Sequence, residues 1–584
     1  MVPLFIRCAG FVSLLVGSAL LFPATGQNQP PPATQTQARS DEVIRVNTEL
    51  VQTDVTVFDK KGRFVDQLRA DDFELMVDGK PQPISLFERV SFASRALRPS
   101  EPSPENNAAT SARRRTVLFF IDDVHLAAGS LVRARKALLD FVEHGMAEND
   151  QVAITSSSGQ IGFLQQFTDN RIVLQTAVAR LNYRANAKFD MERPPMSEYM
   201  ASKIQDGDES AISYYVTEMM KQQCYRASGE TICMMDTQSA RHLVMNRARA
   251  ITTNTAPDTR NTLVMLEGLM RTAAQLPGRK LLFLISDGFY LNDPQTGSLD
   301  RIKKITDAAG RAGVVIYTLD ARGLVSDSLD ALNDRPIDSE GLTMGGVFGE
   351  ISASQDGLNA LARDTGGQAF RNTNRPMGEW VKQVLDENST YYVLAWRPQS
   401  DEQKRRGFKN LQIRVKGRAD LTTRMRRGYF RTTPLPMLSV KGKSEKGITA
   451  RESDMRLVID APVAGREIKT NLSVSLTPVP GIGTRVIVTV EIDRNGLAFD
   501  LFDGKPAADV DIGGIFYDDK GKPSKSFVGR LRVSAADASQ LNAPAVYRFQ
   551  AWLPAGLYQV RVGLRDPRNG RTGNAEQWIK VLSP

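Results

Sequence analysis

The fold of this chain is decided by Thr116-Val-Leu-Phe-Phe-Ile121, which Asp122 and Asp123 follow, and by Lys280-Leu-Leu-Phe-Leu-Ile-Ser-Asp-Gly288. Each segment is an almost continuous apolar run that ends in an acid. Such runs are typical of parallel strands that are buried on both faces, and parallel sheets bind ligands beyond the carboxyl ends of their strands. The two segments therefore predict a parallel-sheet α/β domain with acidic side chains at its ligand-binding end.

The surrounding sequence predicts the rest of this domain. We expect further strands at 152–155 and 314–319, and an edge strand at 368–370. Amphipathic helices should alternate with the strands. They are expected after Ser130 and after Asp169 as N-caps, at 262–276 and at 299–312.

The first residues have the pattern of a secretory signal peptide. Arg7 precedes an uncharged run from Cys8 to Phe22, and Ala24-Thr-Gly26 is a small-x-small cleavage site. Cys8 lies before the apolar core, which is not where a lipoprotein acylation site would be. No later segment approaches the roughly 20 apolar residues of a spanning helix. We expect export to the periplasm, the cell surface or the medium, with Gln27 as the new N-terminus and no membrane span.

Alternating apolar and polar residues predict two β-rich regions on either side of the α/β domain. The pattern runs from Val43 to Ile84-Ser-Leu-Phe87 and returns in Tyr391–Trp396 and Leu411–Phe430, so we expect one β-sandwich that is split by the inserted domain. The strands from Leu457 to Val581 predict a second, immunoglobulin-like β-sandwich.

Pro-rich and polar segments mark the domain boundaries of the 584 residues. The expected order is signal peptide 1–26, linker 27–41, first part of the β-sandwich 42–98, linker 99–113, α/β domain 114–375, second part of the β-sandwich 376–432, linker 433–455 and the C-terminal sandwich 456–584.

Charge and cysteine content limit the partners and the redox state. The 75 Lys and Arg nearly balance the 66 Asp and Glu, so the sequence does not predict a nucleic-acid partner. Only Cys224 and Cys233 remain after cleavage. In an exported chain they predict a disulfide, with two free buried thiols as the alternative.

The order of these segments resembles a known family. The strand end Phe119-Phe-Ile-Asp-Asp123, Pro277-Gly-Arg-Lys280 before Leu281–Gly288, Val315-Ile-Tyr-Thr-Leu-Asp320, Tyr391-Tyr-Val-Leu394 and Arg427-Gly-Tyr-Phe430 are similar to exported acidobacterial proteins related to the von Willebrand factor type A domain. The resemblance covers about 43–430. It implies a Rossmann-like type A domain, with helices on both faces of a parallel sheet, but it implies no established activity.

The resemblance also implies a metal site, which is damaged in this sequence. Type A domains hold Mg²⁺ or Ca²⁺ with an Asp-x-Ser-x-Ser run, a Thr and a further Asp. Aligning Asp122 with the first Asp places Val124 and Leu126 at the Ser positions. Aligning Asp123 instead places His125 and Ala127 there, and an imidazole suits a transition metal better.

Two interpretations of the site remain open. Asp287 matches the last Asp, and Thr262 matches the Thr, with Thr259 or Thr255 as alternatives. A hydrated Mg²⁺ or Ca²⁺ would be held by Asp122, Asp123, Thr262 and Asp287. Otherwise, these carboxylates end strands and cap the loops that follow, and no cofactor is bound.

Catalytic motifs are absent from the sequence. It has three His (125, 144 and 242), no H-E-x-x-H pair, no G-x-S-x-G elbow and no Gly-rich phosphate loop after a strand. Ser156-Ser-Ser-Gly159 follows a strand without a nearby base in sequence, so we interpret it as a turn. The sequence does not predict an enzyme.

An insertion at about 186–253 should lie over the ligand-binding end of the sheet. It contains eight of the chain's 18 Met (Met191, Met196, Met200, Met219, Met220, Met234, Met235 and Met245) and the cysteine pair. Its thioethers suit either adaptable contact with a partner or packing of a small helical subdomain. We therefore expect an adhesion or protein-interaction protein with an unknown protein or cell-envelope ligand. The alternatives are a metal-dependent accessory hydrolase and a structural envelope component.

Overall fold

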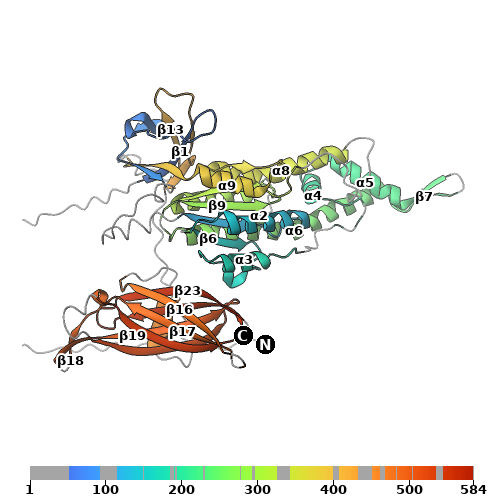
Figure 1. The fold of residues 1–584 in the computed structure, drawn as a ribbon. Helices are drawn as coiled ribbons and strands as arrows, with labels where there is room; N and C mark the ends of the chain where they lie inside the picture. Colours follow the sequence, from blue (N-terminus) through green and yellow to red (C-terminus); the bar gives the residue numbers. More distant parts are fainter. Residues whose placement is uncertain are drawn as a thin grey trace, which may run out of the picture. The chain divides into compact units, whose positions relative to one another are not determined.

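The computed structural model combines a parallel α/β sheet with several antiparallel β-sheets (Figure 1). It describes residues 51–91, 115–148, 150–184, 190, 192, 194–227, 230–276, 278–291, 296–324, 342–398, 407–431, 450–460, 467–479, 481, 483–502, 504–534 and 543–582. The expected signal peptide 1–26 and the linkers 27–41 and 99–113 lie outside the described residues, as does most of the linker 433–455.

The central sheet has five parallel strands in the order β11-β10-β9-β5-β6. They are β5 (Thr116–Ile121), β6 (Gln151–Ser156), β9 (Lys280–Ser286), β10 (Val314–Asp320) and β11 (Ala369–Phe370). All of them were expected from the sequence, and β5 and β9 lie side by side with Ile121 opposite Ile285. The α/β class and the parallel sheet are confirmed.

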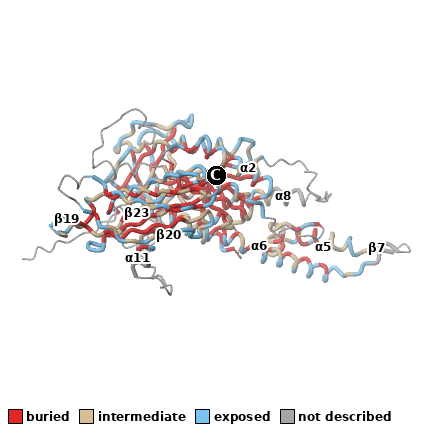
Figure 2. Tube along the Cα trace, turned by 60° about the horizontal axis from the view of Figure 1, so that its bottom comes forward, coloured by how far each residue is buried: buried red, intermediate tan, exposed pale blue. Residues whose placement is uncertain are grey.

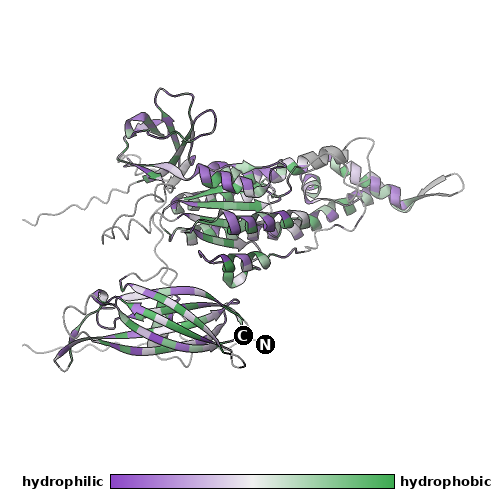
Figure 3. Ribbon diagram, in the orientation of Figure 1, coloured by the Kyte–Doolittle hydropathy of each residue, from purple (hydrophilic) through white to green (hydrophobic). Residues whose placement is uncertain are grey.

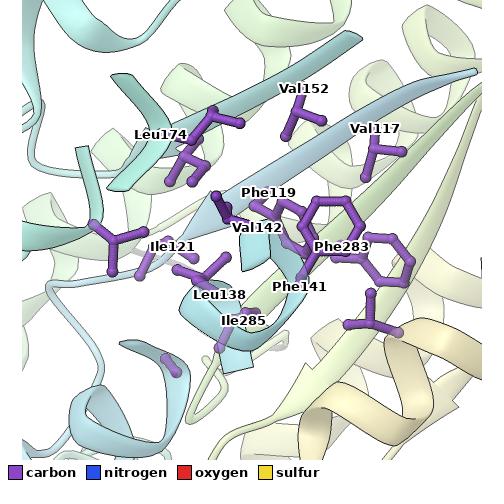
Figure 4. Close-up of a cluster of buried hydrophobic side chains, with 14 of the residues drawn as sticks. Val117, Phe119, Ile121, Leu138, Phe141, Val142, Val152, Leu174, Phe283 and Ile285 are labelled. Atoms are coloured by element: carbon purple, nitrogen blue, oxygen red, sulfur yellow. The ribbon is translucent and has the colours of Figure 1, made fainter. Parts of the chain in front are cut away.

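Alternate side chains of each central strand enter two separate cores, one on each face of the sheet. Val117, Phe119 and Ile121 of β5 belong to one cluster, and Leu118 and Phe120 belong to the other. Figure 4 shows Phe119 and Phe283 together in the first cluster, where their ring centroids are 5.2 Å apart. Burial on both faces explains why these strands are apolar throughout, and they are the green strands of the sheet in Figure 3.

Helices cover both faces of the sheet. The first cluster packs under α2, α3 and α9, and the second packs under α6, α7 and α8. Their bounds are α2 (Ala128–Asp140), α3 (Arg171–Ala179), α6 (Thr237–Ala273), α7 (Ser298–Ala312), α8 (Leu342–Thr365) and α9 (Met377–Glu387). A π-helical turn at Phe141–Gly145 follows α2, and a 3-10 turn at Gly162–Leu164 precedes α3.

Three expected helix starts were wrong. Helix α2 begins after Ala127, so Ser130 lies inside it, and the side chain of Asn170 rather than Asp169 caps α3. The helix expected from 262 begins at Thr237, with Asp236 as its N-cap, and continues through Pro257. A proline removes one helical hydrogen bond, but tertiary packing supplies most helical stability. Here Ala240, Val244 and Ala248 pack on one side of the proline, and the buried face continues beyond it.

The insertion folds into a small helical subdomain. It contains α4 (Glu198–Gln205), α5 (Glu209–Gln223), the hairpin β7 (Cys224–Ala227) and β8 (Glu230–Cys233), and the first part of α6. Met196 is buried in its core, and Met200, Met219, Met220, Met235 and Met245 pack against that core. Met234 is 77% exposed, and Met191 lies outside the described residues. Packing therefore accounts for most of these methionines. A disulfide joins Cys224 and Cys233 across the ends of the hairpin.

Strands from both sides of the central domain form two sheets with one shared core. The sheet orders are β14-β1-β12-β4 and β15-β13-β2-β3. Val55 and Tyr392 from the first sheet share this core with Leu75 and Ile413 from the second. The bounds are β1 (Val51–Phe58), β2 (Phe73–Val77), β3 (Lys80–Gln82), β4 (Leu86–Ser91), β12 (Thr390–Trp396), β13 (Gly407–Val415), β14 (Thr422–Arg424) and β15 (Gly428–Arg431), with a 3-10 turn at Ala70–Asp72.

The expected end of the α/β domain at 375 is too early. Helix α9 follows that position, and its Val381, Val384 and Leu385 belong to the first core of the central sheet. The first strand that pairs with β1 is β12, which starts at Thr390. The boundary therefore falls between Glu387 and Thr390. The sequence pattern had not predicted α8 or α9.

The C-terminal region is antiparallel. One sheet has the order β16-β17-β21, and the other has β18-β19-β22-β23 with β20 on β19. Red, buried tube dominates the interior of this region in Figure 2. The bounds are α11 (Ala450–Ile459), β16 (Thr470–Val479), β17 (Gly483–Ile492), a 3-10 turn (Arg494–Gly496), β18 (Asp500–Phe502), β19 (Lys505–Asp518), β20 (Pro523–Ser534), β21 (Ala545–Leu553), β22 (Gly556–Arg565) and β23 (Thr572–Val581). Helix α11 was not expected, and it occupies the end of the predicted linker.

Candidate functional site

The carboxyl ends of β5 and β9 carry the acids that the sequence singled out. Asp122 and Asp123 follow β5, and Asp287 follows β9. Asp122 and Asp123 are 0% and 2% exposed, so neither side chain faces open solvent. Their hydrogen-bond partners decide whether this end of the sheet can take a ligand.

Side chains of the protein itself surround the Asp122 carboxylate. His125 Nδ1 lies 2.8 Å from each of its oxygens. Thr262 Oγ1 of α6 donates to Oδ1 at 3.0 Å, and Ser286 Oγ of β9 donates to Oδ2 at 2.7 Å. Burial alone would raise the pKa of Asp122, but the charge of His125 and the hydrogen bonds from His125, Ser286 and Thr262 bring it below its ordinary value. The carboxylate is therefore held ionised without a metal.

His125 uses both of its ring nitrogens in this network. Nδ1 donates to Asp122, and Nε2 lies 3.0 Å from Thr259 Oγ1 of α6. Because both nitrogens already have protein partners, His125 has no lone pair directed at a metal or a substrate. The transition-metal interpretation of His125 is not supported by this geometry.

Asp123 turns away from Asp122 and holds the loop after β6. It accepts hydrogen bonds from Ser157 Oγ at 2.8 Å and from the Ser158 amide at 2.9 Å, and Ser158 Oγ donates to it as well. The expected turn at 156–159 is thereby anchored, and two of its three hydroxyls are engaged by a carboxylate.

The side chain of Asp287, which follows β9, reaches the start of α2. Its Oδ2 accepts the Ala127 amide at 2.8 Å, which is the capping role that the sequence offered as the alternative to metal binding. Nothing in the described part of the chain donates to its buried Oδ1. Burial raises the pKa of Asp287 to about 6, and hydrogen bonds from the Ala127 amide and the Ser130 hydroxyl oppose this rise only in part.

The predicted metal ligands are thus not gathered around one point. Asp122 and Thr262 bond to each other, while Asp123 and Asp287 bond elsewhere. Thr255 stays within α6, where its hydroxyl donates to the Thr252 carbonyl, and Thr259 binds His125. Within the described ranges, no group of three or more His, Cys, Asp or Glu is arranged to hold a metal ion.

Sequence reasoning missed Ser286 and the role of His125. Ser286 donates to Asp122, and its Oγ accepts the amide of Gly288. Its position beside Asp287 at the end of an apolar strand was the available signal. Gly288 is itself required, because its φ is +97° and an added Cβ would lie 2.4 Å from the Ser354 carbonyl oxygen.

Comparisons with known proteins leave the family open. No family model matches the chain, and no curated protein matches it. A calcium-binding mutant of Bacteroides uniformis β-glucuronidase 2 is 14% identical over 19% of this chain and 13% of its own, with a TM-score of 0.15. The putative ApaA protein from Bordetella pertussis is 15% identical over 20% of this chain and 95% of its own, with a TM-score of 0.13. Likenesses this weak carry no argument about fold or activity.

Proposed function

We propose that this chain is an exported, non-catalytic protein-interaction or adhesion protein. Its central domain would be a von Willebrand factor type A-like domain, set within a β-sandwich and followed by an immunoglobulin-like sandwich. In this proposal the metal site of the type A domain is degenerate, and partner binding needs no divalent cation. The observation that carries the proposal is the complete set of protein partners around Asp122.

His125 supports cation independence because of where its ring lies. In a metal-binding type A domain, the cation sits against the first Asp and a Thr from a second loop. Here the ring bridges Asp122 and Thr259, so a side chain provides the bonds that an ion and its waters would otherwise provide. Val124 and Leu126 offer no oxygen ligand in exchange.

Helix α6 supports binding through the insertion. Thr259 and Thr262 lie at the carboxyl end of β5, and the helix begins 22 residues earlier at Thr237. At 1.5 Å per residue, this part of the helix is about 33 Å long. It carries the insertion, in which Met234 and Leu243 are 77% and 46% exposed. Exposed apolar side chains on such an extension suit contact with a protein partner.

The geometry does not favour a hydrolase. In the described residues, the Asp287 carboxyl has no histidine beside it, and both nitrogens of His125 are engaged. His144 is 74% exposed and lies 3.3 Å from Asp140, away from the carboxyl ends of the strands. His125 does lie beside a hydroxyl, that of Thr259, but Thr259 is only 2% exposed, so a substrate has no access to this pair.

A capture experiment tests the proposed function. The chain from Gln27 would be immobilised and exposed to an envelope fraction, in Mg²⁺ and in chelator. Three forms would be compared: wild type, Met234→Glu with Leu243→Glu, and Val132→Glu as a control on α2, where Val132 is 67% exposed. We expect wild type and control to retain the same proteins with or without Mg²⁺, and the double variant to lose them. Retention that requires Mg²⁺, or that survives the double substitution, would contradict the proposal.

A further inference from the structure

A cavity of about 510 Å³ lies at the amino ends of β9 and β10, at the end of the strands opposite to Asp122 and Asp287. The lining includes Arg279 and Lys280 at the start of β9, Asp54 of β1, Tyr391 of β12, and Arg426. Small-molecule sites commonly have volumes of about 300 to 1,000 Å³. The cavity is therefore large enough for a small organic molecule.

Arg279 is buried without enough hydrogen-bond acceptors. The residue is 9% exposed, and its Nε and Nη1 atoms are buried with no partner in the described part of the chain. Asp54 Oδ2 is 3.9 Å from Nε, which is beyond hydrogen-bond distance. The guanidinium carbon lies 4.8 Å from the ring centroid of Tyr391. The ring stabilises the position of the cation but cannot accept hydrogen bonds from its in-plane N–H groups. Leaving buried charged donors without hydrogen bonds costs free energy.

Lys280 adds a second buried cation. It is 2% exposed, and its ammonium donates to the Ala312 carbonyl at 2.7 Å. Burial lowers the pKa of Lys280 to about 8, although the Asp54 carboxylate opposes the shift. Arg426 also lines the cavity, where its Nη1 donates to the Gly310 carbonyl at 3.0 Å. Arg311 lines the cavity too, although it is paired with Asp307. Four basic residues thus line the cavity with one acid, Asp54, and a cavity with this balance attracts anions.

We propose that this cavity binds a small organic oxyanion, with Arg279 donating to its oxygens and Lys280 supplying the second positive charge. Planar guanidinium groups match the oxygens of carboxylates and phosphates, and the resulting charge-assisted hydrogen bonds are stronger than neutral ones. The ligand would provide the acceptors that Nε and Nη1 of Arg279 lack. This site is independent of the proposed partner-binding surface on the insertion.

The test uses the chain from Gln27 with inorganic phosphate and with succinate as probes. Each is titrated in calorimetry and in thermal unfolding, against sodium chloride at the same ionic strength. We expect saturable binding of one anion per chain and a rise in melting temperature that depends on its concentration. Binding of phosphate alone or of succinate alone would identify which oxyanion the cavity selects.

Substitutions at the cavity decide whether the response is local. Arg279→Gln and Lys280→Gln should each weaken binding at least tenfold. Arg271→Gln removes the same charge from a side chain that is 71% exposed and paired with Glu267 outside the cavity, so it should bind as wild type does. If Arg279→Gln does not fold, the affinity of Lys280→Gln decides whether the anion binds in this cavity.

Two results would overturn the proposal. The first is a response to both anions that does not exceed the response to chloride, which would mean that water alone fills the cavity. The second is unchanged affinity in the Arg279 and Lys280 variants, which would place the anion elsewhere.

Discussion

At the scale of single residues, Asp122 and Asp287 occupy equivalent strand ends but have opposite electrostatics. His125, Ser286 and Thr262 stabilise the charged form of Asp122, and its pKa is lowered despite burial. Among the described residues, one buried oxygen of Asp287 has no hydrogen-bond partner, and burial raises the pKa of Asp287 to about 6. The negative charge of Asp122 is therefore compensated by His125 and by hydrogen bonds, whereas burial destabilises the ionised form of Asp287.

The raised pKa of Asp287 predicts a pH-dependent cost. An unfolded Asp has a pKa of about 3.9, so between about pH 4 and pH 6 the folded chain holds a proton that the unfolded chain has lost. Stability should fall as the pH rises through this window. Asp287→Asn should remove the effect, so the unfolding free energy of wild type relative to this variant should drop by about 1 to 3 kcal/mol between pH 4 and pH 8. Denaturant unfolding at several pH values measures this drop. If the difference in unfolding free energy between wild type and Asp287→Asn is independent of pH, burial of Asp287 is not the cause.

The sequence predicted that these residues lie at one end of the sheet, but it did not predict their hydrogen-bond partners. Asp122, Thr262 and Asp287 were named because they match the metal-binding residues that the resemblance implies, and the structure places all three near the carboxyl end of the sheet. Which way each carboxylate points depends on contacts across 140 or more residues, such as Thr262 to Asp122 and Asp287 to Ala127. No local pattern contains that information. For His125, the bond to Asp122 is local, but the contact with Thr259 spans 134 residues.

At the scale of elements, apolar periodicity succeeded for strands and failed at helix ends. Strands such as β9 are buried on both faces, and an uninterrupted apolar run marks them clearly. Helix α6 was expected only from 262, although it begins at Thr237 and its buried face continues on both sides of Pro257. Helices α8 and α9 were missed altogether; the buried face of α9 consists of few side chains, among them Val381, Val384 and Leu385.

The exposed Pro257 provides a test of the continuous α6. If the helix runs through this position in solution, Pro257→Ala restores a backbone hydrogen bond to the Thr253 carbonyl without loss of packing. It should raise the unfolding free energy by about 1 to 3 kcal/mol. Thr253→Ala, which is also exposed on α6, serves as the control for a change in helix propensity alone. A destabilising Pro257→Ala would mean that α6 is interrupted there.

At the scale of the whole molecule, the central domain is inserted between strands that pair with each other. Strand β1 pairs with β12, and β2 pairs with β13, so residues more than 300 positions apart share one core. The sequence indicated this organisation because the same alternation appears before and after the α/β segment. It did not place the second boundary, because the contacts of α9 with the central sheet are tertiary. In the described residues, no helix is long and apolar enough to cross a membrane.

The boundary predicts how fragments fold. A fragment of residues 114–389 keeps α9 and should unfold cooperatively. A fragment of residues 114–375 loses the buried Val381, Val384 and Leu385. Because burying each such side chain contributes about 1.5 to 3 kcal/mol, the shorter fragment should be less stable by several kcal/mol. Residues 41–98 alone lack β12 and β13 and should not fold. Calorimetry of the three fragments measures this. A cooperative transition in 41–98 would contradict the paired-strand organisation.

The central claim is that this domain works without a divalent cation, and its melting temperature tests the claim most directly. The chain from Gln27 and its Asp287→Ala variant would be unfolded thermally in chelator and in millimolar Mg²⁺, Ca²⁺ or Mn²⁺, because an ion that binds the folded state raises the melting temperature. With Asp122 already bonded to His125, Thr262 and Ser286, no cation should shift the transition of either protein. A rise of several degrees in the wild type that Asp287→Ala abolishes would contradict the claim.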